Sequence, residues 1–189
     1  YDLVLRASNN METSEGIKNT VALLEQALVI EPEYAIAHSW IAAAYLLELD
    51  YQLIPVTDAD AEKIMTHARR AVELDASDDR GFQLLSDICL FVGHDLVEAR
   101  IHAEHAVKLN PNSTNSVAWM GYIYNCYGET ELAKEYCERA LRQDPLAPGW
   151  VKFLQGVVYF DAGQLDLALG MFLASEWDEK WLHLAAAYA

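Results

Sequence analysis

The sequence predicts an all-α protein built from stacked pairs of antiparallel helices, and a repeated helical pattern carries this prediction. The stretch Thr114–Ala147 contains two amphipathic patterns separated by Gly128. In each pattern the apolar residues recur at i, i+3, i+4 and i+7, so each helix has one face to bury. One helix pair cannot cover both of these faces alone. The pair therefore needs copies of itself on either side, as in a helical solenoid.

Copies of this stretch occur along the chain. Gly121, Tyr124 and Gly128 recur as Gly156, Tyr159 and Gly163, at a spacing of 35 residues. The prolines that end the repeats, Pro111 and Pro145, are 34 residues apart. Small residues stand where two helices must approach closely, and large residues fill the space between them. The spacing and this order of small residues, large residues and prolines together indicate five full repeats.

The pattern resembles the tetratricopeptide repeat (TPR) family, whose repeat is a helix–turn–helix of about 34 residues. The resemblance covers the whole chain and implies a single TPR array at 1–189, a right-handed superhelical solenoid. The expected repeats are approximately 1–34, 35–78, 79–113, 114–147 and 148–177, with a partial sixth at 178–189. The chain starts without a methionine and ends inside an apolar helical pattern. We therefore expect a fragment of a longer protein.

Local signals place the helix ends in the first half of the chain. The first helix of repeat one is expected at 1–11, and Thr13 or Ser14 can cap the second helix, which Pro32 ends. Repeat two contains an insertion of roughly ten residues at about 49–58. The pattern Thr57–Asp60 indicates that the next helix starts there. No stretch alternates with period two between hairpin turns, so no sheet is expected.

The lengthened second repeat and the opening YDLVLRA narrow the resemblance. They are similar to the TPR regions of bacterial signalling proteins that carry an OmpR-type winged-helix domain or a class III nucleotide cyclase domain. Neither of those domains is present in these residues. The resemblance implies a regulatory module of such a protein.

Composition restricts the possible partners. The chain has 13 Lys and Arg against 29 Asp and Glu, a net charge of −16. Such a charge repels phosphate backbones and anionic membranes, so we expect no nucleic acid and no membrane partner. A basic or apolar protein or peptide is favoured instead. Three cysteines without metal-type spacing suit a reducing compartment, and we expect a cytoplasmic location.

One helix face carries a possible metal-binding pattern. Glu98, His102 and His105 lie at i, i+4 and i+7, so a carboxylate and two imidazoles could face zinc or nickel. These residues interleave with Ala99, Ala103 and Ala106, which are expected to face inward. The favoured interpretation is therefore a solvated polar face, with no metal and no cofactor.

Other chemical groups have simple structural interpretations. His38 occupies a core position of the repeat and is interpreted as a satisfied interior histidine. Cys89 and Cys137 are expected in the core, where thiols are inert, whereas Cys126 is expected on the inner surface and is the one to test for reactivity. The sequence has no nucleophile–base set, no glycine-rich phosphate loop and no H-E-x-x-H motif. We expect no catalytic activity in these residues.

The resemblance implies a concave groove lined by the first helix of each repeat. The residues expected to bind a partner there, called the groove residues below, are Leu47, Arg80, Gln83, Asp87, Phe91, Asn115, Tyr122, Asn125, Trp150, Phe153 and Phe160. The groove becomes more aromatic toward its C-terminal end. Those aromatic residues either bind a partner or are covered by further repeats. The lysines with which some TPR domains hold acidic chaperone tails are missing, so acidic peptides are not the expected ligands.

The sequence thus predicts a protein–protein interaction scaffold that binds a peptide or helix in this groove. The alternative is a regulatory, sensor or self-association domain of a bacterial nucleotide cyclase or transcription regulator. Self-association through the C-terminal end of the chain is also possible under both interpretations.

Overall fold

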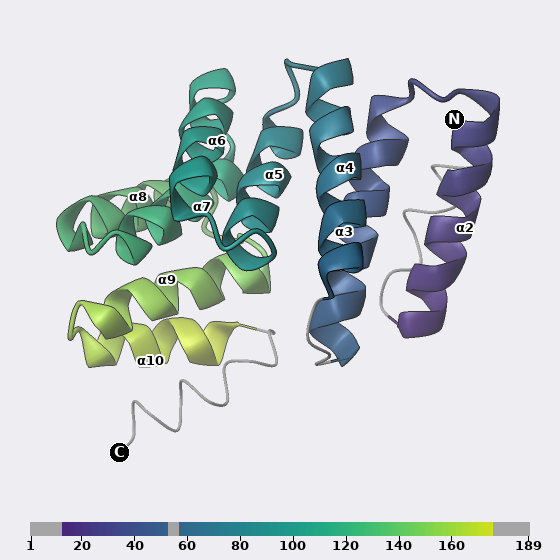
Figure 1. The fold of residues 1–189 in the computed structure, drawn as a ribbon. Coiled ribbons are helices and arrows are strands. Elements are labelled where there is room, and N and C mark those ends of the chain that lie inside the picture. Colours follow the sequence, from purple (N-terminus) through teal and green to yellow (C-terminus); the bar gives the residue numbers. More distant parts are fainter. Residues whose placement is uncertain (1–12, 53–56, 176–189) are drawn as a thin grey trace. The chain divides into compact units, whose positions relative to one another are not determined.

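The computed structural model describes residues 13–52 and 57–175. The regular elements of these residues are α2 (Ser14–Ile30), α3 (Ala35–Gln52), α4 (Asp58–Leu74), α5 (Asp79–Phe91), α6 (Leu96–Leu109), α7 (Thr114–Cys126), α8 (Thr130–Gln143), α9 (Gly149–Asp161) and α10 (Leu165–Ala174) (Figure 1). No strand occurs among the described residues, and the predicted all-α class is confirmed. The first helix expected at 1–11 and the partial sixth repeat expected at 178–189 lie outside the described residues.

Consecutive helices pack as hairpins, and the hairpins form two compact units. Tyr1–His102 form the first unit and Ala103–Ala189 the second, with the boundary inside α6. In the first unit α3 packs against both α2 and α4. In the second unit α7 packs against α8, α9 packs against α10, and α7 also lies against α9 (Figure 1). This is the arrangement of a helical repeat, in which each element is covered by its neighbours.

The predicted helix starts are confirmed in the first unit. The Oγ1 atom of Thr13 accepts a hydrogen bond of 3.1 Å from the N–H of Gly16 and caps α2. Thr57 and Asp60 form a capping box at the start of α4. Helix α3 continues to Gln52, so the first residues of the expected insertion extend the first helix of repeat two. Residues 53–56 of the insertion are not described.

The turns within repeats four and five depend on glycine. Gly128 has a φ of 73° and Gly163 a φ of 72°, the left-handed conformation that glycine adopts without steric cost. In repeat three the left-handed residue is instead His94, with a φ of 51°, directly after the expected turn residue Gly93. There the N–H of Asp95 bonds to the carbonyl oxygen of Cys89 at 2.9 Å.

The helices of a repeat meet at small residues. A β-carbon added to Gly121 would lie 3.2 Å from the carbonyl oxygen of Ala133 and 3.3 Å from Cys137 Sγ. A β-carbon added to Gly156 would lie only 2.5 Å from the ring of Phe172, which is fully buried. The small residues of the sequence pattern therefore fix how closely the two helices pack.

Among the described helices, none is both long enough and apolar enough to cross a bilayer.

Two glycine substitutions test the packing of the last described repeat. Gly156→Ala is expected to lower the free energy of unfolding by about 1–3 kcal/mol, because the new methyl group would overlap the buried ring of Phe172. Urea unfolding followed by circular dichroism measures this change.

The matched control is Gly170→Ala, the same substitution inside α10, where a β-carbon would meet nothing within 4 Å. This variant is expected to keep or increase stability, by up to about 1 kcal/mol, since alanine favours the helix. Equal effects of the two substitutions would contradict the contact between Gly156 and Phe172.

Candidate functional site

The first helices of repeats two to five, α3, α5, α7 and α9, carry all of the predicted groove residues. In the first unit Leu47 lies on α3, and Arg80, Gln83, Asp87 and Phe91 lie on α5. In the second unit Asn115, Tyr122 and Asn125 lie on α7, and Trp150, Phe153 and Phe160 lie on α9. Because α3 contacts α5 and α7 contacts α9, each unit brings two rows of these positions together.

The groove residues of the first unit differ in exposure. Leu47 is partly buried against Ile17, Val21 and Ala44 and therefore belongs in part to the core. On α5, Arg80 is exposed and Gln83 and Asp87 are half-buried. Phe91, at the end of α5, leaves 47% of its surface exposed. Phe91 therefore contributes apolar surface at the end of α5.

A hydrogen bond joins the two rows in the second unit. Asn125 Nδ2 on α7 donates to Asp161 Oδ2 on α9 over 2.6 Å. This bond links the C-terminal ends of the two first helices. Asp161 occupies the same repeat position as Cys126, 35 residues earlier, so the repeat spacing predicts both residues on the inner surface.

The aromatic groove residues of the second unit fall into two groups. Tyr122 and Phe160 are half-buried, and the ring of Tyr122 lies 5.5 Å from that of the buried Trp119. Phe153 is only 7% exposed, and its ring lies 6.0 Å from the ring of Phe172. Tyr122 and Phe160 thus keep part of their surface exposed, whereas most of Phe153 is covered.

Trp150 shares the partial exposure of the first group and the core contacts of the second. It is half-buried and packs against a cluster that includes Val117, Ala118 and Val151. Its truncation would disturb the core as well as the surface, so its effect on binding must be separated from its effect on folding.

Cys126, the thiol expected on the inner surface, is exposed. Desolvation of the sulfur raises the pKa of this thiol, and the neighbouring carboxylate of Asp161 adds to the increase, while a hydrogen bond with Tyr122 opposes it. A thiol with a raised pKa carries little thiolate near neutral pH, so it is a weak nucleophile.

A histidine pair joins α3 to α4 in the first unit. The Nδ1 atoms of His38 and His67 lie 3.0 Å apart, and His38 Nε2 lies 3.2 Å from the carbonyl oxygen of Pro32. Because a carbonyl only accepts, Nε2 of a neutral His38 carries the proton and its Nδ1 accepts from His67. Both ring nitrogens of His38 have partners, in keeping with its interpretation as a satisfied histidine.

The pair makes stability depend on pH. Burial lowers the pKa of His67, the charges of His38 and Lys63 lower it further, and Glu25 partly opposes them. The unfolded chain therefore binds the proton at a higher pH than the folded chain does. The contribution of His67 to stability is expected to be fully present above about pH 6.5, the ordinary histidine value, and to be lost as the pH decreases from there toward the lower pKa of folded His67.

Unfolding of His67→Gln between pH 7.5 and pH 5 (roughly the range of histidine titration) tests this expectation. The variant should lose less stability on acidification than the unmodified chain. His105→Gln, on the exposed side of α6, is the matched control and should keep the original pH dependence. A His67→Gln profile parallel to that of the unmodified chain would contradict the proposed linkage.

The arrangement of stacked helix hairpins is that of TPR proteins among the solved structures. TTC0263, a thermophilic TPR protein from Thermus thermophilus, matches with a TM-score of 0.76 at 17% identity, over 99% of this chain and 97% of that chain. YrrB, described as a TPR protein with an unusual peptide-binding site, matches with a TM-score of 0.57 at 16% identity, over 97% of this chain and 90% of that chain. These likenesses show that the chain has the TPR fold.

A third match is a structure that holds m7Gppp-AAAA, whereas the description of YrrB names a peptide-binding site. The human IFIT1 dimer with m7Gppp-AAAA has a TM-score of 0.78 and 17% identity to this chain, covering 92% of this chain and 42% of that chain. No protein-family model matches the sequence, and no curated protein does.

Proposed function

We propose that this chain is a protein-interaction scaffold without catalytic activity, and that it binds a peptide or helix across α7 and α9. One observation supports this most. The first helices of two neighbouring repeats lie against each other, and together they carry the half-buried side chains of Tyr122, Asn125 and Phe160. The description of YrrB as having a peptide-binding site provides a precedent for this use of the fold.

The residue types fit such a role. Half-buried aromatic side chains bury a large area in a complex and lose little conformational freedom, so they often carry most of the binding energy. The Asn125–Asp161 bond holds polar groups beside them, which can orient the backbone of a bound segment. In the first unit, taken by itself, Phe91 and Arg80 on α5 are exposed, and they are proposed as contacts for a partner of that unit.

Charge indicates the kind of partner. The net charge of −16 and the exposed carboxylate of Asp161 favour a segment that combines apolar and basic residues. Complementary charge accelerates association more than it increases affinity, so the aromatic contacts are expected to determine how tightly the partner binds.

Peptide selection tests the proposed groove. Peptides selected from a displayed random library against the 189-residue chain are synthesised, and their dissociation constants are measured by fluorescence anisotropy. Tyr122→Ala and Phe160→Ala are each expected to weaken binding by about 2 kcal/mol, roughly 30-fold. Thermal melting of every variant separates loss of binding from loss of structure. This control matters most for Phe153→Ala and Trp150→Ala, because both side chains pack into the core.

The matched control is Leu146→Ala, which shortens an apolar side chain that is 88% exposed in the loop after α8. It should bind the selected peptides like the unmodified chain. The groove proposal fails if Tyr122→Ala and Phe160→Ala bind normally while Glu135→Lys, on the exposed side of α8, abolishes binding.

The charge also leads to a prediction about nucleic acids. Neither duplex DNA nor the capped oligonucleotide m7Gppp-AAAA is expected to bind measurably at physiological salt, because 29 acidic residues oppose 13 basic ones. A gel shift and an anisotropy titration with labelled probes measure this. Salt-sensitive binding of either probe would contradict the prediction.

The alternative proposal is a regulatory domain that acts by self-association. It is supported by three exposed leucines on the last described helix, Leu165, Leu167 and Leu173 on α10. Sedimentation equilibrium of the 189-residue chain distinguishes the two proposals. A dimer that Leu173→Glu converts to a monomer would favour self-association, whereas a monomer that binds peptides would favour the scaffold.

A further inference from the structure

We propose that Cys89, Glu98 and His102 form a binding site for one zinc-type divalent transition-metal ion, between α5 and α6 in the first unit. Cys89 comes from α5, and Glu98 and His102 lie one helical turn apart on α6. This site is separate from the groove residues and uses the second helix of repeat three.

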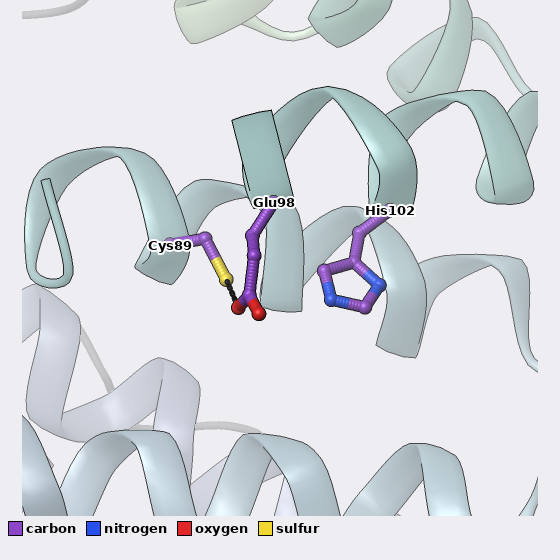
Figure 2. Close-up of side chains that lie close together, drawn as sticks. All are labelled: Cys89, Glu98 and His102. Atoms are coloured by element: carbon purple, nitrogen blue, oxygen red, sulfur yellow. Dashed lines mark hydrogen bonds between the residues drawn. The ribbon is translucent and has the colours of Figure 1, made fainter. Parts of the chain in front are cut away.

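The donor atoms converge (Figure 2). The sulfur of Cys89, a carboxylate oxygen of Glu98 and a ring nitrogen of His102 all lie within 4.8 Å of one another. Cys89 Sγ and Glu98 Oε2 are 3.7 Å apart. Two such ligands on a tetrahedral zinc ion, with bonds of about 2.3 Å to sulfur and about 2.1 Å to oxygen, would lie roughly 3.6 Å apart. The existing separation of these two atoms is thus close to that of a formed site.

Helix packing explains why these side chains meet. Ser86 Oγ, which is buried on α5, donates a hydrogen bond of 2.7 Å to the carbonyl oxygen of Ala99 on α6. Ala99 is fully buried, and its small side chain lets α5 and α6 approach closely around it. Glu98 and His102 flank this alanine on α6 and lie at the edge of the same interface.

The spacing along α6 alone groups Glu98 and His102 with His105 on a solvated helix face. The structure replaces His105 in this group with Cys89 of α5. In the structure Glu98 contacts Cys89, His102 is half-buried, and His105 is not part of the group. The third donor comes from the other helix of the pair, which the spacing within α6 alone does not reveal.

The neighbouring groups suit a bound dication. A thiolate and a carboxylate together supply two negative charges. The ring of His102 lies 6.0 Å from the ring of Phe82 at an interplanar angle of 31°, a contact that restrains the imidazole. Arg69 Nη2 lies 3.6 Å from Glu98 Oε2, but its side chain is 57% exposed and can turn toward water when a metal occupies the carboxylate.

Exposure defines the kind of site. Cys89 is buried and Glu98 is exposed, so an ion between them would face protein on one side and solvent on the other. Three protein ligands leave the fourth tetrahedral position to water. The set of sulfur, nitrogen and oxygen donors favours Zn²⁺, Co²⁺ or Cd²⁺ over Mg²⁺ or Ca²⁺, which prefer oxygen ligands alone.

Binding has a proton cost. Burial and the nearby charge of Glu98 raise the pKa of the Cys89 thiol to about 12. The metal must therefore replace the thiol proton, so the S–H bond breaks, a metal–sulfur bond forms and the proton leaves to solvent. This cost is the same for every metal and lowers each affinity, and metals that bind thiolate strongly offset it best.

Cobalt provides a direct test in the 189-residue chain, kept reduced. Addition of Co²⁺ is expected to produce a thiolate-to-cobalt charge-transfer band in the near ultraviolet and the visible bands of tetrahedral cobalt, saturating at about one ion per chain and reversed by Zn²⁺, which binds such sites more tightly. Cys89→Ser should abolish the charge-transfer band. Glu98→Gln and His102→Asn, whose side chains are not fully buried, should each weaken cobalt binding by about tenfold or more.

Matched controls separate this site from other donors. His105→Asn, three residues further along α6, and Cys126→Ser, which removes the exposed thiol, should leave the cobalt spectrum and affinity unchanged. Circular dichroism verifies that each variant is folded. The proposal is overturned if the unmodified chain gives no charge-transfer band, if the band survives in folded Cys89→Ser, or if His105→Asn weakens binding as much as His102→Asn does.

Discussion

The contact on which this structure depends is the close approach of the two helices within each repeat. At Gly156 the space for a β-carbon is already occupied by the ring of Phe172, and at Gly121 it is bounded by Ala133 and Cys137. A hydrogen atom at such a position lets two helix backbones approach more closely than ordinary side chains would allow. Because protein interiors are densely packed, the distance and rotation of the second helix are then determined within narrow limits.

This constraint also orients the first helices. Once α8 covers one face of α7, and α10 covers one face of α9, the remaining faces of α7 and α9 are free to pack against each other. Tyr122, Asn125 and Phe160 then lie on two adjoining helices, and the Asn125–Asp161 bond links them. The proposed binding surface is therefore a consequence of how each hairpin closes and does not require a separate structural feature.

The same close packing accounts for the proposed metal site in the first unit. The small Ala99 and the hydrogen bond from Ser86 bring α5 and α6 together, and Cys89 then reaches the carboxylate of Glu98. The two sites differ in chemistry, since one presents aromatic and amide groups and the other thiol, carboxylate and imidazole. The metal site lies on α5 and α6, whereas the main proposed peptide contacts lie on α7 and α9.

Local sequence signals determined the helical class, the capping residue Thr57 and the glycine turn at Gly128, because caps, turns and amphipathic periodicity depend on residues a few positions apart. They left Thr13 and Ser14 as alternative caps of α2, and the structure decided for Thr13. The repeat spacing also identified Gly121 as a point of close helix contact. Only the tertiary structure decided that Phe153 is covered by Phe172, that His38 pairs with His67, and that Cys89 meets Glu98. These contacts join residues on different helices. Their distances depend on helix rotation and packing, which periodicity along one helix does not specify.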